Sequence, residues 1–204
     1  RETYERLVDF ARRRNLVVVN DNPYSFILNE GEHLSILAID GAKECCIELN
    51  SMSKSHNMPG WRVGMLAANA EFVSWILKVK SNIDSGTFRA VQLAAAAAMD
   101  NDEDWHREHN VRRYAERRTL AESIMQALGC RFDRAQTGLF LWGRIPDALA
   151  DAEELTERAL HEADVFITPG GIFGQNGRRY VRISLCADEN RMSEALARIQ
   201  NVFA

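Results

Sequence analysis

The sequence lacks an apolar run long enough to cross a membrane. Its longest run, residues 93–99, is mostly alanine, whereas a membrane-spanning helix needs roughly 20 apolar residues. The first residues do not have the charged start, apolar centre and cleavage site of a secretory signal peptide. These absences predict a cytoplasmic protein that has no membrane partner.

A surplus of basic residues is absent as well. The chain has 25 Lys and Arg against 29 Asp and Glu, and the two signs are mixed along its length. Because proteins that bind nucleic acid through its phosphates carry a basic patch, no nucleic-acid partner is expected. With 46% hydrophobic residues among its 204, the chain is long enough to bury the core of one large or two small globular domains.

Patterns typical of metal sites are also missing. The cysteines form no CxxC pair and are too few for a secreted disulfide scaffold, so we expect all of them to be buried thiols in a reducing compartment. They are Cys45, Cys46, Cys130 and Cys186. His106 and His109 have a spacing that suits two ligands on one helix face, but they lie in a strongly charged stretch. A solvent-exposed helix surface is the better interpretation, and no metal is predicted.

Apolar periodicity predicts an α/β fold in which helices alternate with short strands. Helices are expected at the N-terminus and over 71–80, 87–99, about 100–128, 147–163 and 189–203, and strands over 16–20, 45–50, 63–67, 131–132, 139–142, 165–168 and 180–185. Ser85 or Thr87 is placed to cap the helix at 87, and Gly129 to end the long helix. A domain boundary is expected between residues 100 and 101.

Polar residues follow two of the predicted strands. Asp21 comes directly after strand 16–20, which is apolar enough to be buried on both faces, and Lys54 lies in the polar loop after strand 45–50. In open α/β sheets, ligands bind at the carboxyl ends of the strands. We therefore expect Asp21 and Lys54 to face one crevice, although they lie far apart in the sequence.

The most informative stretch is residues 51–64, SMSKSHNMPGWRVG. It resembles the cofactor-lysine signature of class I and II aminotransferases, the fold-type I enzymes that use pyridoxal 5'-phosphate. The resemblance implies that Lys54 forms a Schiff base with the cofactor, and that Arg62, Ser51 and Ser53 bind its phosphate. The chemistry agrees, because an aldehyde is held by a primary amine, and a guanidinium binds phosphate through two parallel hydrogen bonds. An ordinary surface lysine is the alternative for Lys54 taken alone.

Residues 21–24, DNPY, resemble the Asp-x-x-Tyr element of the same family. The resemblance implies that Asp21 pairs with the pyridine nitrogen and that the Tyr24 hydroxyl contacts the phenolic oxygen. A neighbouring carboxylate keeps that nitrogen protonated, and the protonated ring draws electrons from the substrate. Without the later lysine motif, this tetrapeptide would be interpreted as a common turn.

Residues 180–185, YVRISL, resemble the family's C-terminal element, in which the arginine binds the substrate α-carboxylate. That role falls to Arg182, whose planar fork suits a carboxylate and orients the substrate. The alternative is an arginine in an edge strand that makes a surface salt bridge. Gly138, in QTGLF at 136–140, matches a glycine near the substrate. The glycines of 170–177 precede a strand, which argues against a nucleotide loop.

The resemblance covers nearly the whole chain but only the second half of a complete enzyme. It implies that residues 1–100 are the C-terminal part of the cofactor-binding large domain and its sheet. Residues 101–204 would be the small α/β domain with a long connecting helix. The first half of such enzymes has a phosphate-binding turn and a ring-stacking aromatic residue, which have no counterpart here. The 204-residue chain alone is therefore expected to be inactive.

The activity implied by the resemblance is transfer of an amino group from an amino acid to a 2-oxo acid in a homodimer. Segment 82–86, NIDSG, favours the branch with aspartate and LL-diaminopimelate aminotransferases, although the amino donor is left open. Two alternatives remain at this point. One is a β-eliminating carbon–sulfur lyase of the same fold, and the other is a non-catalytic folding or assembly module.

Overall fold

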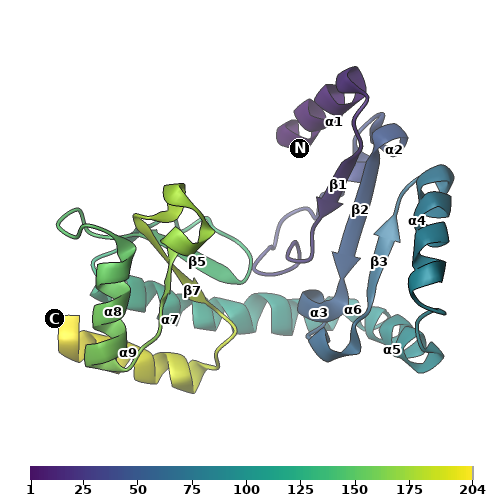
Figure 1. Ribbon diagram of the computed structural model, residues 1–204. Helices are drawn as coiled ribbons and strands as arrows, with labels where there is room; N and C mark the ends of the chain where they lie inside the picture. The colour runs from purple at the N-terminus through teal and green to yellow at the C-terminus, as the bar shows by residue number, and fades with distance from the viewer. Residues whose placement is uncertain (204) are drawn as a thin grey trace. The chain divides into compact units, whose positions relative to one another are not determined.

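The structure, a computed structural model, describes residues 1–203 and divides into two compact units (Figure 1). The first unit comprises Arg1–Arg107 and the second begins at Glu108. The division lies a short way beyond the predicted boundary after residue 100, inside the helical segment that we expected to connect two domains. The assignment of the first unit to a cofactor-binding large domain stays a prediction.

A three-stranded sheet forms the centre of the first unit. Its middle strand is β2 (Cys46–Ser51), which pairs in parallel with β1 (Val18–Asp21) and antiparallel with β3 (Gly64–Ala67). Asp21 lies opposite Leu49 in the register. Because β1 and β2 run in the same direction, the residues that follow both strands leave the sheet at one edge.

Helices surround this sheet and provide its core. They are α1 (Glu2–Arg14), η1 (Ile36–Ala38), α2 (Ala42–Cys45), α3 (Met52–Ser55), η2 (Pro59–Trp61), α4 (Ala70–Ile83), α5 (Arg89–Met99) and α6 (Asp102–Trp105). Val8 and Ala11 on α1 are buried in one cluster with Ile36, Ala42 and Cys46. Full burial of a Val or Ile side chain contributes about 1.5–3 kcal/mol, so this cluster holds α1 and α2 against the sheet.

The expectation that strand 16–20 is buried on both faces is wrong for this chain. Strand side chains alternate between the faces of a sheet, and Val18 packs against the α1–α2 cluster. Val17 and Val19 point the other way and are 53% and 55% exposed. The surface of β1 that carries these two side chains is open to solvent, although Ile47, which lies beside Val19 in the register, is buried.

The long helix after residue 100 is present but is not uniform. It begins as α6, continues as a π-helical stretch, η3 (His106–Arg113), and ends as α7 (Tyr114–Ala127). Gly129 follows with φ +69°, which confirms it as the residue after the helix end. His109 is buried, not exposed as expected. Burial, together with the charges of Arg113 and Arg117, lowers the pKa of His109.

Two smaller expectations are also wrong. Neither Ser85 nor Thr87 caps α5, which begins after Phe88 without a side-chain cap; the Thr87 carbonyl instead accepts a hydrogen bond from the Gln92 side chain. Three of the cysteines are buried, and burial raises the pKa of Cys130 to about 12. Cys186 is exposed, because it lies in the turn that follows a strand end.

The second unit is a four-stranded antiparallel sheet with helices packed on it (Figure 1). The strand order is β4 (Arg131–Phe132), β5 (Phe140–Arg144), β7 (Tyr180–Ser184) and β6 (Thr168–Pro169). The helices are α7, α8 (Ala152–Ala163) and α9 (Glu189–Phe203), with short turns η4 (Gly170–Phe173) and η5 (Gln175–Gly177). Buried Leu141, Val181 and Ile199 are part of its core.

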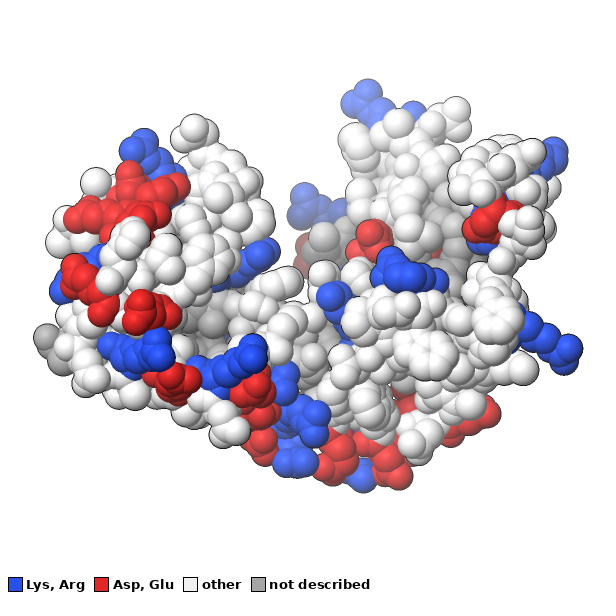
Figure 2. All heavy atoms as spheres, turned by 60° about the horizontal axis from the view of Figure 1, so that its bottom comes forward, with Lys and Arg blue, Asp and Glu red and all other residues white. Residues whose placement is uncertain are grey.

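Acidic and basic side chains lie side by side on the face of the molecule drawn in Figure 2, as the mixed charges of the sequence suggest. Within residues 1–203, no helix is long and apolar enough to cross a membrane.

Candidate active site

Lys54 lies on α3, a single helical turn that follows β2 directly. The Ser51 hydroxyl caps this turn by accepting a hydrogen bond from the Ser53 amide at 3.2 Å. The Ser55 hydroxyl donates to the Ser51 carbonyl, also at 3.2 Å. Met52 is buried against Met58 and Ala95. The turn is therefore fixed at both its polar and its apolar side, while Lys54 itself is only partly buried.

Arg62 reaches the same end of the sheet from the neighbouring strand. Ser51 pairs with Gly64 at the end of the β2–β3 ladder, and the Met52 amide continues it by donating to the Val63 carbonyl. Arg62 directly precedes Val63 in the chain and has a left-handed conformation with φ 51°. Its Nη1 donates to the Pro59 carbonyl at 2.9 Å, and its side chain is exposed.

The two glycines around Arg62 differ in their surroundings. A Cβ added to Gly64 would lie 2.6 Å from the Asn50 carbonyl oxygen, whereas one added to Gly60 would meet nothing within 4 Å. Neither glycine has a positive φ. Gly64 thus allows β3 to approach β2 closely beside the lysine turn, and Gly60 has no such role in packing.

We expect Gly64→Ala to lower the free energy of unfolding by about 1–3 kcal/mol, as overpacking typically does. Gly60→Ala is the matched control and should change it by less than about 0.5 kcal/mol. Denaturant unfolding of both variants measures the difference. Equal stability of the two variants would contradict the close approach at Gly64.

Asp21 lies at the edge of the sheet that carries Lys54. It is the last residue of β1, and the following Asn22 amide donates to the Leu49 carbonyl, which keeps the chain beside β2. Tyr24 is 38% exposed in the turn that follows. Among the described residues, Asp21, Lys54 and Arg62 take part in no ion pair with another side chain. One carboxylate and two cations are thus left for a ligand.

Arg182 lies in the second unit, and its surroundings exclude the edge-strand alternative. It is in β7, which has β5 on one side and β6 on the other. Its guanidinium carbon is 4.3 Å from the ring centres of both Phe140 and Phe173, within the range of cation–π contacts. Its Nε is buried without a hydrogen-bond partner among residues 1–203. A buried donor without a partner is costly, so an acidic ligand group fits here.

Gly138 is buried in the loop before β5, with φ +87°. Sequence reasoning missed the residue that holds this loop, Arg118 on α7. Arg118 is 7% exposed and donates to the carbonyls of Asp133, Arg134 and Gln136. The sequence signal is its spacing, because Arg118 lies on the same helix face as Tyr114 and Ala121, where apolar residues are expected.

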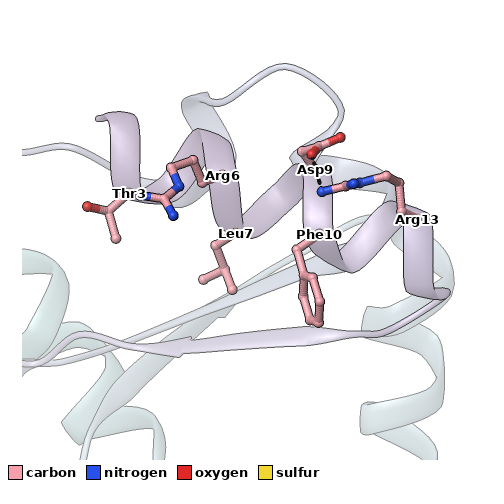
Figure 3. Close-up of a pocket in the computed structure, with 6 residues that line it drawn as sticks. All are labelled: Thr3, Arg6, Leu7, Asp9, Phe10 and Arg13. Atoms are coloured by element: carbon pink, nitrogen blue, oxygen red, sulfur yellow. Dashed lines mark ion pairs between the residues drawn. The ribbon is translucent and has the colours of Figure 1, made fainter.

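A hollow is formed on α1 in the first unit. Figure 3 shows the side chains that line it, which are Thr3, Arg6, Leu7, Asp9, Phe10 and Arg13. Asp9 and Arg13 form an ion pair at 2.7 Å. All six residues come from a single helix, and none of them is a predicted site residue.

Comparison with known proteins identifies the family. The model of the family "Aminotransferase class I and II" matches residues 1–199, and the chain belongs to this family. Among curated relatives, LL-diaminopimelate aminotransferase of Aquifex aeolicus is 39% identical over 203 residues, which are 98% of this chain and 52% of the relative. That of Desulforudis audaxviator is 40% identical over 201 residues, or 98% of this chain and 51% of the relative.

Solved structures confirm the expected fold. Substrate-bound BacF from Bacillus subtilis superposes with a TM-score of 0.89 at 29% identity, over 100% of this chain and 52% of BacF. A probable N-succinyldiaminopimelate aminotransferase from Thermus thermophilus superposes with a TM-score of 0.86 at 32% identity, over 98% and 54%. The chain thus spans about half the length of the proteins it matches.

Proposed function

We propose that the protein containing this chain is a pyridoxal-phosphate-dependent aminotransferase that moves an amino group from an amino acid to a 2-oxo acid. The observation that supports this most is the gathering of Asp21, Lys54 and Arg62 at one edge of the first unit's sheet. None of these three side chains forms an ion pair with another side chain of the described residues. Family membership gives independent support.

The donor set fits the proposed cofactor. The primary amine of Lys54 suits the aldehyde, and the exposed Arg62 guanidinium suits the phosphate. The Ser51 hydroxyl accepts from the Ser53 amide, so its own proton remains for a phosphate oxygen, with the Ser53 hydroxyl as a second donor. The Asp21 carboxylate suits a ring nitrogen that must stay protonated, and the Tyr24 hydroxyl suits the phenolic oxygen.

When bound, pyridoxal phosphate supplies an electron sink for the bond that breaks at the substrate Cα. Lys54 holds the cofactor and then carries the proton to and from that carbon, for which its long flexible stem is suited. Arg182 binds the substrate carboxylate in the plane of its guanidinium, and Gly138 leaves room beside the substrate. We propose LL-diaminopimelate as the first amino donor to test, because curated relatives carry that name.

Borohydride reduction of the full-length protein with pyridoxal phosphate should attach the cofactor covalently to Lys54. Peptide mapping by mass spectrometry locates the label, and the exposed Lys43 serves as the internal control. A label on another lysine would refute the central assignment. Release of ammonia and pyruvate from cysteine-like substrates without a 2-oxo acid would favour the lyase. Cytoplasmic location, homodimeric state and inactivity of the 204-residue chain alone stay predictions.

A further inference from the structure

The turn that carries Lys54 is tied to α6 by two aromatic side chains. His56 follows the turn, and its Nδ1 lies 2.9 Å from the Ser55 hydroxyl, while its Nε2 lies 3.0 Å from Oδ1 of Asp102. The Nε2 contact is within ion-pair distance but lacks the alignment of a hydrogen bond. Trp105 adds a second tie, because its Nε1 donates to the Ser55 carbonyl at 2.7 Å.

On the side of the turn these contacts are largely removed from solvent, whereas the Asp102 side chain is 48% exposed. The His56 side chain is 10% exposed, and Ser55 is 4% exposed. The Ser55 hydroxyl also donates to the Ser51 carbonyl, so hydrogen bonds link the end of β2 through Ser55 to Trp105 on α6. In a partly buried environment such contacts are screened less by water than surface pairs are, and they restrain the groups that they join.

A four-residue turn cannot hold its conformation by its own hydrogen bonds, since isolated helices shorter than about 12 residues are marginal in water. The position of the Lys54 Cα therefore depends on what is packed around α3. Met52 anchors the turn on its apolar side. His56 and Trp105 anchor it on its polar side, because both contact Ser55, the residue directly after Lys54.

We propose that His56 and Trp105 are positioning residues for Lys54, which hold its amine at the edge of the sheet where Asp21 lies. This inference rests on the proposed function. Neither residue needs to touch substrate or cofactor, because His56 acts on the Ser55 hydroxyl and Trp105 on the Ser55 carbonyl of the turn. A displacement of the reacting group by about 1 Å can lower a rate about 100-fold, so loosening this turn should affect catalysis more than binding.

The test compares His56→Phe and Trp105→Phe with the unchanged full-length holoenzyme. His56→Phe keeps a ring of similar bulk, Trp105→Phe keeps a smaller aromatic ring, and both lose the polar contacts. We expect kcat to fall about 10- to 100-fold in His56→Phe. KM for the amino donor should change less than about threefold, because the groups that bind the donor equally in the ground state and the transition state are unchanged. Borohydride labelling of Lys54 should stay complete. The matched control is His161→Phe, which removes an exposed histidine–carboxylate pair on α8, 3.1 Å from Glu157, and should leave kcat unchanged.

Asp102→Asn provides a second, milder variant, because the Asp102 side chain is 48% exposed and the substitution keeps its shape. It should lower kcat, and its effect should not add to that of His56→Phe, because contacting residues are coupled. If His56→Phe does not fold, Asp102→Asn and Trp105→Phe decide the matter. A lowered unfolding midpoint with unchanged kcat in these variants would show a purely structural role and overturn the proposal. Absence of any label on Lys54 in the unchanged protein would instead overturn the proposed function, and this inference with it.

Discussion

Replacement of Lys54 by alanine should lower kcat for amino-group transfer by about 10³-fold or more, because proton transfer by a positioned side chain alone contributes about 10²–10⁴-fold. The covalent attachment point of the cofactor is lost in the same step. The side chain is only partly buried, and the contacts that hold its turn, such as the burial of Met52 and the cap from the Ser51 hydroxyl, do not involve the Lys54 side chain. We therefore expect the variant to fold, and a steady-state assay with a coupled 2-oxo acid readout measures the loss.

Two further variants make this prediction specific to the amine. Lys54→Arg keeps the positive charge but has no primary amine, so it should be as inactive as the alanine variant. Lys43→Ala removes an exposed lysine on α2 and should retain full activity. An active Lys54→Arg enzyme would mean that only the charge at this position matters, which is incompatible with the proposed chemistry.

Substitution of Arg182 by alanine should reduce kcat/KM for amino acids by about 100-fold or more, since each hydrogen bond to a charged group is worth about 1.5–3 kcal/mol. Arg182→Lys should recover only part of this, because an ammonium lacks the two-pronged fork. The effect should be specific to the carboxylate. For an amine substrate without that group, the unchanged enzyme and Arg182→Ala should be equally slow.

The control for Arg182 is Arg191→Ala, which removes an exposed arginine near Asp188 and should leave kcat/KM unchanged. Arg182 also contacts Phe140 and Phe173, so denaturant unfolding of each variant separates a loss of stability from a loss of substrate binding. A loss of kcat/KM that is the same for substrates with and without a carboxylate would contradict the assigned role.

Much of the fold was predictable because its elements have strong local signals. Helices α1, α8 and α9 bury one apolar stripe each, and such stripes are visible in the sequence. The position of Asp21 and Lys54 at one edge was predictable because polar residues directly follow β1 and β2. The roles of these residues come from the family's motifs, since spacing alone does not distinguish a cofactor lysine from a surface lysine.

The features that escaped prediction depend on tertiary contacts. Val17 and Val19 are apolar yet exposed, because burial depends on what covers a sheet face and not on the strand. His109 lies in a charged stretch yet is buried in the π-helical part of the long helix, where its ring packs edge-on against Tyr114. Arg118 binds three loop carbonyls that are distant in sequence, and no local pattern shows which carbonyls those are.

The two phenyl rings beside Arg182 have a consequence for the acids that it can accept. Phe140 and Phe173 lie with their ring centres at equal distances from the guanidinium carbon, so apolar rings occupy part of the space around the cation. We expect an acid to reach the guanidinium along its nitrogen-bearing rim, where a planar two-oxygen group would match the fork, whereas a sulfonate would keep one oxygen without a donor. Rings that restrain the guanidinium would also restrict the torsion of an acid group bound to it.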